Sequence, residues 1–156
     1  MLQQKRGMLV SSVSLLVPLS GLILFHIYFT SKDATLCYND ICFHAHIAQT
    51  DEERTQGLMH KAHLSKYKWM LFPFTEPKET DFWMKDVLIP LGIVRFDSWF
   101  KVLHTVSAMP CSAEPCPLYH YSGAASYVLE INEMRIDDLP IQEGQTWTST
   151  FHNEDE

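Results

Sequence analysis

The chain has 156 residues, 46% of them hydrophobic and 20% charged, which excludes a disordered chain, a collagen-like chain and a chain with several sizeable cores. Twelve Lys and Arg against 19 Asp and Glu leave a formal net charge of −7. So acidic a chain lacks the basic surface on which nucleic-acid binding depends. We therefore expect one folded domain and no nucleic-acid partner.

The N-terminal part of the chain predicts a membrane anchor. The segment from Met8 to Phe29 carries no Asp, Glu, Lys or Arg, and at about 1.5 Å per residue it can cross a hydrocarbon core about 30 Å thick. Lys5 and Arg6 precede the segment and should stay cytoplasmic by the positive-inside rule. We expect residues 1–31 to form a cytoplasmic stub and a signal anchor in the cell (inner) membrane, crossing it once, with the rest facing the periplasm or the exterior. A cleaved signal peptide is the alternative, although the apolar run is longer than a usual one and no Ala-x-Ala pair closes it.

Four cysteines occur in two pairs with the same C-x4-C spacing, Cys37 with Cys42 and Cys111 with Cys116. The Asn-Asp dipeptide inside the first pair suits a two-residue hairpin turn with positive φ, which places Cys37 opposite Cys42 at disulfide distance. The second pair lies in a loop that three prolines stiffen. We expect two local disulfides. The alternative is a four-thiolate zinc site, whose ligands more often sit two to four residues apart and favour a reducing compartment.

Residues 32–152, the expected extracytoplasmic domain, divide into short strands and one helix. The segment from Cys42 to Ile47 alternates apolar and polar side chains, as a half-buried strand does. Thr50 to Glu53 form a capping box, and Gly57 lies near the expected end of the helix. Six further strands are expected, at Met70–Phe74, Thr80–Asp86, Leu91–Asp97, Phe100–Val106, Ser126–Ile131 and Gln145–Phe151. Together they predict a mostly β (α+β) fold, a small β-barrel or curled sheet of about seven strands, followed by an acidic tail at residues 153–156.

Rare residue types recur in a fixed order over roughly 100 residues from Ile47 onward. The motifs are Ala48 with Thr50 and Glu53-Arg54, Gly57-Leu58-Met59, Met70-Leu71-Phe72, Phe82-Trp83-Met84-Lys85, Ile89-Pro90-Leu91, Pro110-Cys111 with Cys116-Pro117 and Tyr119, and Tyr127-Val128-Leu129-Glu130. Their order and spacing resemble domain-of-unknown-function family 192, a bacterial and archaeal family of small domains. The resemblance implies a compact β-barrel-like domain with a short helix, often exported, and no established reaction.

The chain departs from the pattern of this family at three positions. The residue after Lys85 is usually Asn in the family and is Asp86 here, a usual Asp is Gly92, and a usual Glu is His46. If a site of the family uses those side chains, the resemblance implies that the site is altered in this chain.

Catalytic and metal chemistry find little support in the motifs. Among eight histidines, His44 with His46 share one strand face and His60 with His63 lie three residues apart, so these pairs are weak metal candidates. No third ligand at a suitable spacing completes either pair, and we expect surface histidines rather than a metal site. The chain has no Gly-x-Ser-x-Gly elbow, and cysteines in disulfides offer no nucleophile. We therefore expect no catalytic residue and no cofactor.

The candidate ligand-binding residues are Arg54, Trp83, Lys85, Asp86 and Glu130. Alternation places Trp83 and Lys85 on one strand face and Asp86 on the other, so that one face belongs to the core and the other can line a groove. Arg54 on the helix and Glu130 in an apolar strand are charges at positions that favour burial. A buried ion pair is one interpretation, and an exposed strand face explains Glu130 equally well.

These features predict a membrane-anchored extracytoplasmic domain that binds a small ligand, an envelope component or a protein partner without catalysis. The alternative is an enzyme with a polar pocket around Arg54, Lys85, Asp86 and Glu130, which requires that these groups converge within a few ångströms. A third hypothesis is a structural role in an envelope assembly, which an exposed apolar patch rather than a pocket would indicate.

Overall fold

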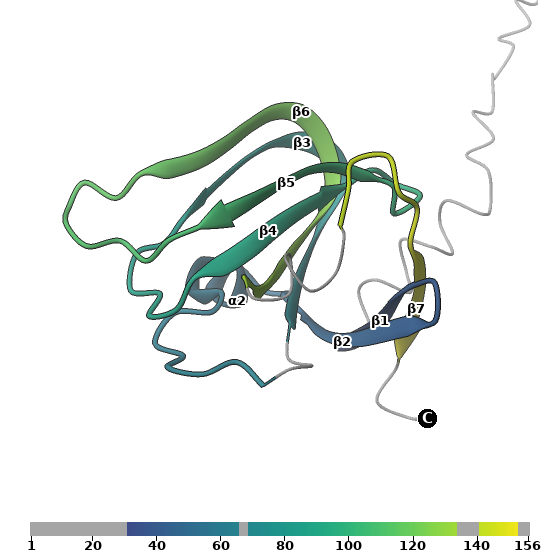
Figure 1. Ribbon diagram of the computed structural model, residues 1–156, viewed down its shortest axis with the longest axis horizontal. Helices are drawn as coiled ribbons and strands as arrows, with labels where there is room; N and C mark the ends of the chain where they lie inside the picture. Colours follow the sequence, from purple (N-terminus) through teal and green to yellow (C-terminus); the bar gives the residue numbers. More distant parts are fainter. Residues whose placement is uncertain (1–30, 66–68, 134–140, 153–156) are drawn as a thin grey trace, which may run out of the picture.

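The computed structural model describes residues 31–65, 69–133 and 141–152, which form one seven-stranded sheet with one short helix (Figure 1). In chain order the elements are β1 (Asp33–Tyr38), β2 (Ile41–Ile47), α2 (Asp51–Gln56), β3 (Trp69–Trp83), β4 (Leu91–Phe96), β5 (Val102–Ala108), β6 (Leu118–Asn132) and β7 (Thr148–His152). The order across the sheet is β5-β4-β6-β3-β2-β1-β7. Neighbouring strands are antiparallel except for the parallel pair β2 and β3.

The sheet curls until its two edges meet at one point. β5 and β7 are the edge strands, and Lys101, just before β5, forms an isolated bridge with Thr146, just before β7. The backbone N–H of Val102 also donates to the carbonyl of Gln145 at 2.7 Å. Over the described ranges the sheet does not close, so of the two predicted architectures the curled sheet is the one found.

Apolar side chains pack against both faces of this sheet. Because successive side chains of a strand point to opposite faces, β6 contributes to two separate cores. The first core lies within the curl and is rich in stacked rings, including Phe43 on Trp69 with ring centroids 3.9 Å apart. The second lies on the opposite face and is built from Ala48, Leu58, Phe72, Met84, Val87, Leu91, Ile93, Ala108, Ala125 and Val128.

The helix lies on the second face because of the parallel strand pair. Parallel neighbours need a crossover connection, and α2 with the residues that follow it supplies the crossover from β2 to β3. The predicted capping box is present: Thr50 Oγ1 accepts a hydrogen bond from the Glu53 N–H at 3.1 Å, and Glu53 Oε2 accepts one from the Thr50 N–H at 3.0 Å. The helix ends at Gln56, one residue before the predicted Gly57.

The two predicted strands Met70–Phe74 and Thr80–Asp86 are one strand. β3 runs through both segments and pairs with β6, and its register shifts between Pro73 and Lys78 and again before Thr80. Proline has no N–H for the ladder, so the sequence reads there as a break between strands. β3 ends at Trp83, three residues before the predicted end, and the predicted strand Ser126–Ile131 is the last part of β6.

Two other predicted strands begin too early. Phe100 has a positive φ of 57° and therefore lies in a turn, so β5 starts at Val102 rather than at Phe100. β7 starts at Thr148 rather than at Gln145. The predicted strand Leu91–Asp97 is found one residue shorter, as β4.

Both predicted disulfides are present. Cys37 faces Cys42 across β1 and β2 with Cα atoms 4.1 Å apart, in the predicted register. Asn39 in the turn has a φ of 53°, but Asp40 does not take the positive φ that we expected of it. Cys111 and Cys116 are also bonded, which leaves no thiolates for a zinc site.

The predicted anchor at residues 8–29 and the tail at residues 153–156 lie outside the described residues. Within the described ranges, no helix has the length and apolar character that spanning a bilayer requires.

Candidate functional site

Helix α2, the residues after it and β3 enclose a cleft of about 390 Å³ on the second face of the sheet, within the usual size range of small-molecule sites. We refer to it as the α2–β3 cleft. Its lining comprises residues 54–59, Phe72, Phe74, residues 78–83, Val87 and Glu130.

Gly57 shapes one wall of this cleft. It follows the helix with φ 48° and ψ −128°, a conformation that is open to glycine and strained for other residues, and its N–H donates to the Glu53 carbonyl at 2.8 Å. A Cβ built at this position would lie 3.4 Å from Glu130 Oε2 and 3.7 Å from the Phe72 ring. The glycine therefore turns the chain back over the sheet and leaves space above a buried carboxyl group.

Glu130 is the most deeply buried charged side chain in the lining. It lies in β6, opposite Met70 of β3 and Ile93 of β4, with 4% of its surface exposed. Its Oε2 atom has no hydrogen-bond partner among the described residues. Burial raises the pKa of the Glu130 carboxyl to about 8, so the group is mostly protonated at neutral pH.

A buried polar atom without a partner has a cost. Leaving such an atom unsatisfied costs about 1–3 kcal/mol, and native structures contain few of them. Glu130 nevertheless occupies a central strand position, between Met70 of β3 and Ile93 of β4. An unpaired acid in a cleft is therefore a candidate for function.

Arg54 and Trp83 line the same cleft as Glu130. Arg54 is half-buried on α2, and its Nη1 donates to the Pro73 carbonyl at 2.7 Å. Burial is the sole cause of the pKa shift of Glu130, so Arg54 does not compensate its charge. The structure thus brings three of the five predicted residues together in one cleft. Glu130 is buried, as the interpretation of a buried ion pair required, but it is not paired with Arg54.

Lys85 lies outside the α2–β3 cleft. Its Nζ is 3.2 Å from Glu114 Oε1, in the loop of the second disulfide, and 5.6 Å from the centroid of the Trp83 ring. Lys85, and the Cys116 N–H after it, lower the pKa of the Glu114 carboxyl. This pair is on the surface and ties the turn after β3 to the disulfide loop.

Asp86 also lies outside the cleft, and the predicted alternation does not extend to it. β3 ends before Asp86, which sits in a turn with φ 55° and whose carbonyl accepts a hydrogen bond from the His60 N–H at 2.8 Å. Asn and Asp tolerate this left-handed conformation best among residues with a side chain. The Asn that the family resemblance gave for this position meets the same backbone need. The predicted convergence of four polar groups is therefore not found.

The weak metal candidates His44 and His46 lie on adjacent positions of one outer face but in different contacts. His44 Nδ1 is 3.0 Å from Thr35 Oγ1, which also lies 2.7 Å from His152 Nε2. His46 lies between two carboxylates, with Nδ1 3.4 Å from Asp33 and Nε2 3.5 Å from Glu53.

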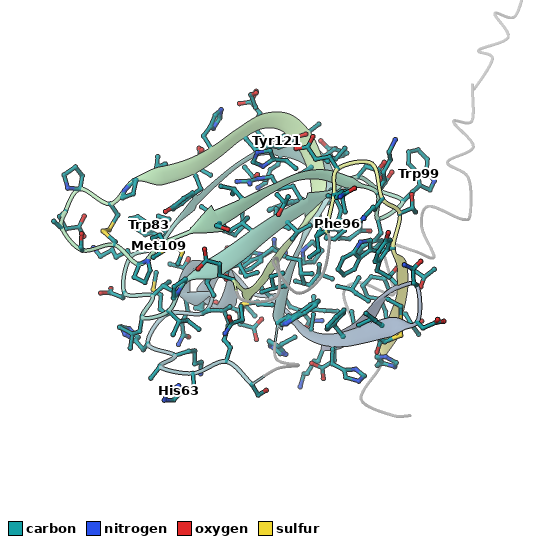
Figure 2. All side chains as sticks on the ribbon, in the orientation of Figure 1. His63, Trp83, Phe96, Trp99, Met109 and Tyr121 are labelled. Atoms are coloured by element: carbon teal, nitrogen blue, oxygen red, sulfur yellow. A yellow bond between two sulfur atoms is a disulfide. The ribbon has the colours of Figure 1, made fainter. Side chains whose placement is uncertain are left out.

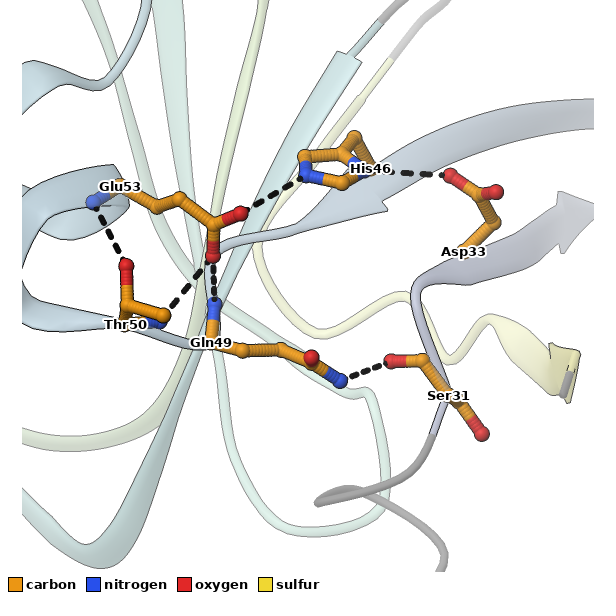
Figure 3. A network of polar contacts seen from close by, with 6 residues as sticks. All are labelled: Ser31, Asp33, His46, Gln49, Thr50 and Glu53. Atoms are coloured by element: carbon orange, nitrogen blue, oxygen red, sulfur yellow. Dashed lines mark hydrogen bonds and ion pairs between the residues drawn. The ribbon is translucent and has the colours of Figure 1, made fainter. Parts of the chain in front are cut away.

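Figure 3 shows this second network, in which Glu53 also caps α2 and Gln49 bonds to the Ser31 carbonyl. Hydrogen bonds from the Thr50 and Gln49 N–H groups lower the pKa of the Glu53 carboxyl. The contacts join the start of β1 to the helix. No group of three or more suitable metal ligands occurs within residues 31–65, 69–133 and 141–152, and His60 and His63 are exposed.

Arg95 in β4 is a buried charge that the sequence analysis did not identify. Its Nε donates to Thr80 Oγ1 at 2.9 Å, its Nη2 to the Tyr119 carbonyl at 2.6 Å, and its Nη1 is 3.2 Å from His104 Nδ1. Burial lowers the pKa of Arg95, and burial followed by the adjacent guanidinium lowers the pKa of His104. Arg95 lies within an apolar strand, as Glu130 does, so the same sequence pattern could have identified Arg95 as a buried charge.

Three charged residues of β3 also line the cleft and are not among the residues predicted from the sequence. Lys78, Glu79 and Asp81 are exposed. The Lys78 ammonium lies 4.4 Å from the centroid of the Phe74 ring, and Asp81 Oδ1 is 2.7 Å from His120 Nδ1. Their place in the cleft depends on the continuous strand β3, which the sequence predicted as two separate strands.

Several large apolar side chains are exposed among the described residues, namely Ile41, Trp83, Leu88, Trp99, Met109 and Leu118. Trp83 pairs with Leu118 across β3 and β6, and both are exposed. Figure 2 shows Trp83 and Met109 at one end of the molecule and Trp99, which is 77% exposed, at the other. Trp99 is thus separate from Trp83 and Met109.

Comparison with known proteins places the fold in a family. The model of the DUF192 family, described as "Uncharacterized ACR", matches residues 34–148. No curated protein is detectably similar to the chain in sequence.

Two crystal structures share the fold. One is a protein of Sinorhizobium meliloti 1021 whose assignment as a transcription regulator is provisional, with a TM-score of 0.67, 22% identity, and coverage of 78% of this chain and 95% of that one. The other is a protein of unknown function from Novosphingobium aromaticivorans DSM 12444, with a TM-score of 0.64, 25% identity, and coverage of 74% and 83%.

Proposed function

Since this chain belongs to the DUF192 family, whose function is uncharacterized, we propose that it is a membrane-anchored extracytoplasmic domain that binds a small ligand in the α2–β3 cleft without catalysis. One observation carries the proposal: buried Glu130 lines the cleft, and its Oε2 atom lacks a hydrogen-bond partner among the described residues. A ligand would supply the missing partner.

The other residues of the cleft suit this role. Small-molecule sites are mostly apolar with a few placed polar groups, and here aromatic and aliphatic side chains surround Glu130 and the Arg54 guanidinium. Arg54 is already oriented by the Pro73 carbonyl, so little of its conformational freedom is lost when a ligand binds.

The enzyme hypothesis has one observation in its favour, the pKa of Glu130 at about 8, which is suitable for a general acid or base near neutral pH. A reaction also needs a second group that holds or activates the substrate at the reacting atoms. The enzyme hypothesis requires that Arg54, Lys85, Asp86 and Glu130 converge, and Lys85 and Asp86 lie outside the cleft. Binding without catalysis is therefore the better supported function.

Ligand capture tests the binding proposal. The purified full-length chain is incubated with a small-molecule extract of cells, and retained compounds are identified by mass spectrometry. We expect a compound that is retained by the wild type and by the control variant Lys85→Met, which changes a charge outside the cleft. Arg54→Met and Glu130→Gln should retain much less of it. Equal retention by all four proteins would place the ligand site elsewhere and contradict the proposal.

The membrane anchor is a separate part of the proposal. The two disulfides support an oxidising compartment for residues 31–152, and the apolar segment from Met8 to Phe29 is long enough to span a bilayer. We expect the protein to stay in the membrane fraction after carbonate washing. Release by carbonate, or a mature N-terminus near residue 31, would contradict anchoring.

A further inference from the structure

We propose that the ligand group that contacts Glu130 is a primary ammonium carried on an apolar body, and that its binding releases one proton. The inference rests on the proposed function of the α2–β3 cleft and names the chemistry of its ligand. The Oε2 atom of Glu130 is buried without a hydrogen-bond partner among the described residues, and only 4% of the surface of Glu130 is exposed.

No cation among the described residues forms a hydrogen bond with Glu130 Oε2. Arg54 of α2 donates to the Pro73 carbonyl, and Arg95, which lies on the same sheet face in β4, donates to Thr80 and Tyr119. The Lys78 ammonium of β3 lies over the Phe74 ring. None of these cations offsets the charge of Glu130, and burial is the one cause of the raised pKa of its carboxyl.

The remaining charged groups that face the cleft are acidic. Glu79 and Asp81 of β3 belong to the lining together with Glu130. The two cations of the lining are already engaged, Arg54 by the Pro73 carbonyl and Lys78 by the Phe74 ring. Directly beside Glu130 an anion would therefore meet a carboxyl group, whereas an ammonium would meet complementary charge. An ammonium also donates three hydrogen bonds and accepts none, which matches an acceptor without a donor.

The walls of the cleft suit an apolar body. Phe72 and Phe82 meet edge to face with centroids 5.2 Å apart, and Leu58 and Val87 are buried beside them. Aromatic faces attract cations, as Lys78 over Phe74 shows within this same cleft. An arylalkyl or alkyl amine therefore fits both the acid and its surroundings.

The protons balance without any co-reactant. Before binding, the Glu130 carboxyl holds a proton and the amine is an ammonium. In the complex an ammonium faces a carboxylate, so the carboxyl O–H bond breaks and one proton passes to the solvent. Because the free carboxyl has a pKa of about 8, affinity should rise about tenfold per pH unit between pH 6 and 7 and level off above about pH 8.

Isothermal titration calorimetry of the full-length chain in nanodiscs, with empty nanodiscs as the blank, tests the inference. The probes are 2-phenylethylamine, 2-phenylethanol and 3-phenylpropionate, which share a ring and differ in the polar group. Titrations at pH 6.5 in phosphate and in ACES buffer measure proton release, since the two buffers differ in protonation enthalpy. We expect the amine to bind tightest of the three and to release close to one proton, and the alcohol to release none.

Glu130→Gln should abolish proton release and the pH dependence of amine binding, whereas the control Glu76→Gln, at an exposed position of β3 outside the cleft lining, should keep both. Amine binding without proton release by the wild type would overturn the inference whether or not Glu130→Gln folds. Binding of the propionate or the alcohol in preference to the amine would also overturn it and leave the proposed function standing. Failure of the proposed function would be seen separately, as equal ligand retention by the cleft variants in the capture experiment.

Discussion

Glu130→Gln should remove a large part of the pH dependence of folding stability. The carboxyl has a pKa of about 8 in the fold, against an ordinary value of 4.5. Between these values it is protonated in the native state and ionised in the unfolded chain, so the native state binds more protons. Stability should therefore fall as pH rises through this window. The glutamine side chain has nearly the same shape and does not titrate.

The size of the effect follows from the two pKa values of Glu130. Each unit of difference corresponds to about 1.4 kcal/mol, so the free energy of unfolding should decrease by about 5 kcal/mol from pH 4.5 to about 8 because of this group alone. Below pH 4.5 the carboxyl is protonated in both states and contributes no slope. Above about pH 8 it is ionised in both states and the loss is complete.

Urea unfolding of the wild type and Glu130→Gln at pH 5, 6.5 and 8 measures this decrease, with fluorescence of the buried Trp69 and Trp147 as the signal. His104 has a lowered pKa and contributes a slope of opposite sign below its ordinary value of 6.5. That slope is common to both proteins and cancels in their difference. Glu79→Gln, at an exposed position of the same cleft, serves as the matched control.

The difference in unfolding free energy between Glu130→Gln and the wild type should grow with pH by several kcal/mol between pH 5 and 8. A difference that stays constant over this range would show that the carboxyl is not held in its neutral form. The same result in Glu79→Gln as in Glu130→Gln would assign the effect to the general charge of the cleft. Either outcome would refute the reasoning from burial.

Met84 is fully buried, so Met84→Ala should lower the unfolding free energy by about 2–5 kcal/mol in urea titrations, and a loss below about 1 kcal/mol would contradict its place in the second core. Asp86→Asn should leave stability unchanged, whereas Asp86→Val should cost about 1–2 kcal/mol because of the positive φ; equal stability of the two variants would contradict this backbone role. Lys85→Ala should leave the melting temperature nearly unchanged because its ion pair is exposed, and a large drop would indicate a structural role. Replacing both Cys37 and Cys42 by Ser should cost about 2 kcal/mol from the lost loop constraint, measured against the oxidised wild type; an unchanged midpoint would show that the turn alone holds the hairpin.

Features that depend on neighbouring residues could be predicted from the amino-acid sequence. The Cys37–Cys42 hairpin depends on a turn residue that accepts positive φ and on two cysteines at matching distances from it, and all of these lie within six positions. The capping box of Thr50 and Glu53 likewise involves groups three residues apart. Such features need no knowledge of distant parts of the chain, and they were predicted with their partners.

The bounds of the strands depend on contacts between distant parts of the chain. The segment from Pro73 to Thr80 is polar and proline-containing and reads as a loop, yet it belongs to β3 because β6 pairs with it on both sides of the register shifts. In the same way the turn at Asp86 is stabilised by the distant His60 N–H. These partners are far apart in sequence, so periodicity within one segment cannot reveal them.

The candidate site was likewise only partly accessible from the sequence. A glutamate within an apolar strand indicates that Glu130 is unusual, but burial and an exposed face are both compatible with that pattern. The sheet decides between them, because β3 and β4 flank β6 and the crossover after α2 covers this face at Gly57. Whether Glu130 has a partner also depends on the hydrogen bonds of the two nearby arginines. Arg54 donates to the Pro73 carbonyl, and Arg95 donates to Thr80 and to the Tyr119 carbonyl. These hydrogen bonds join distant strands and leave Glu130 Oε2 without a partner among the described residues, so they could not be predicted from the sequence.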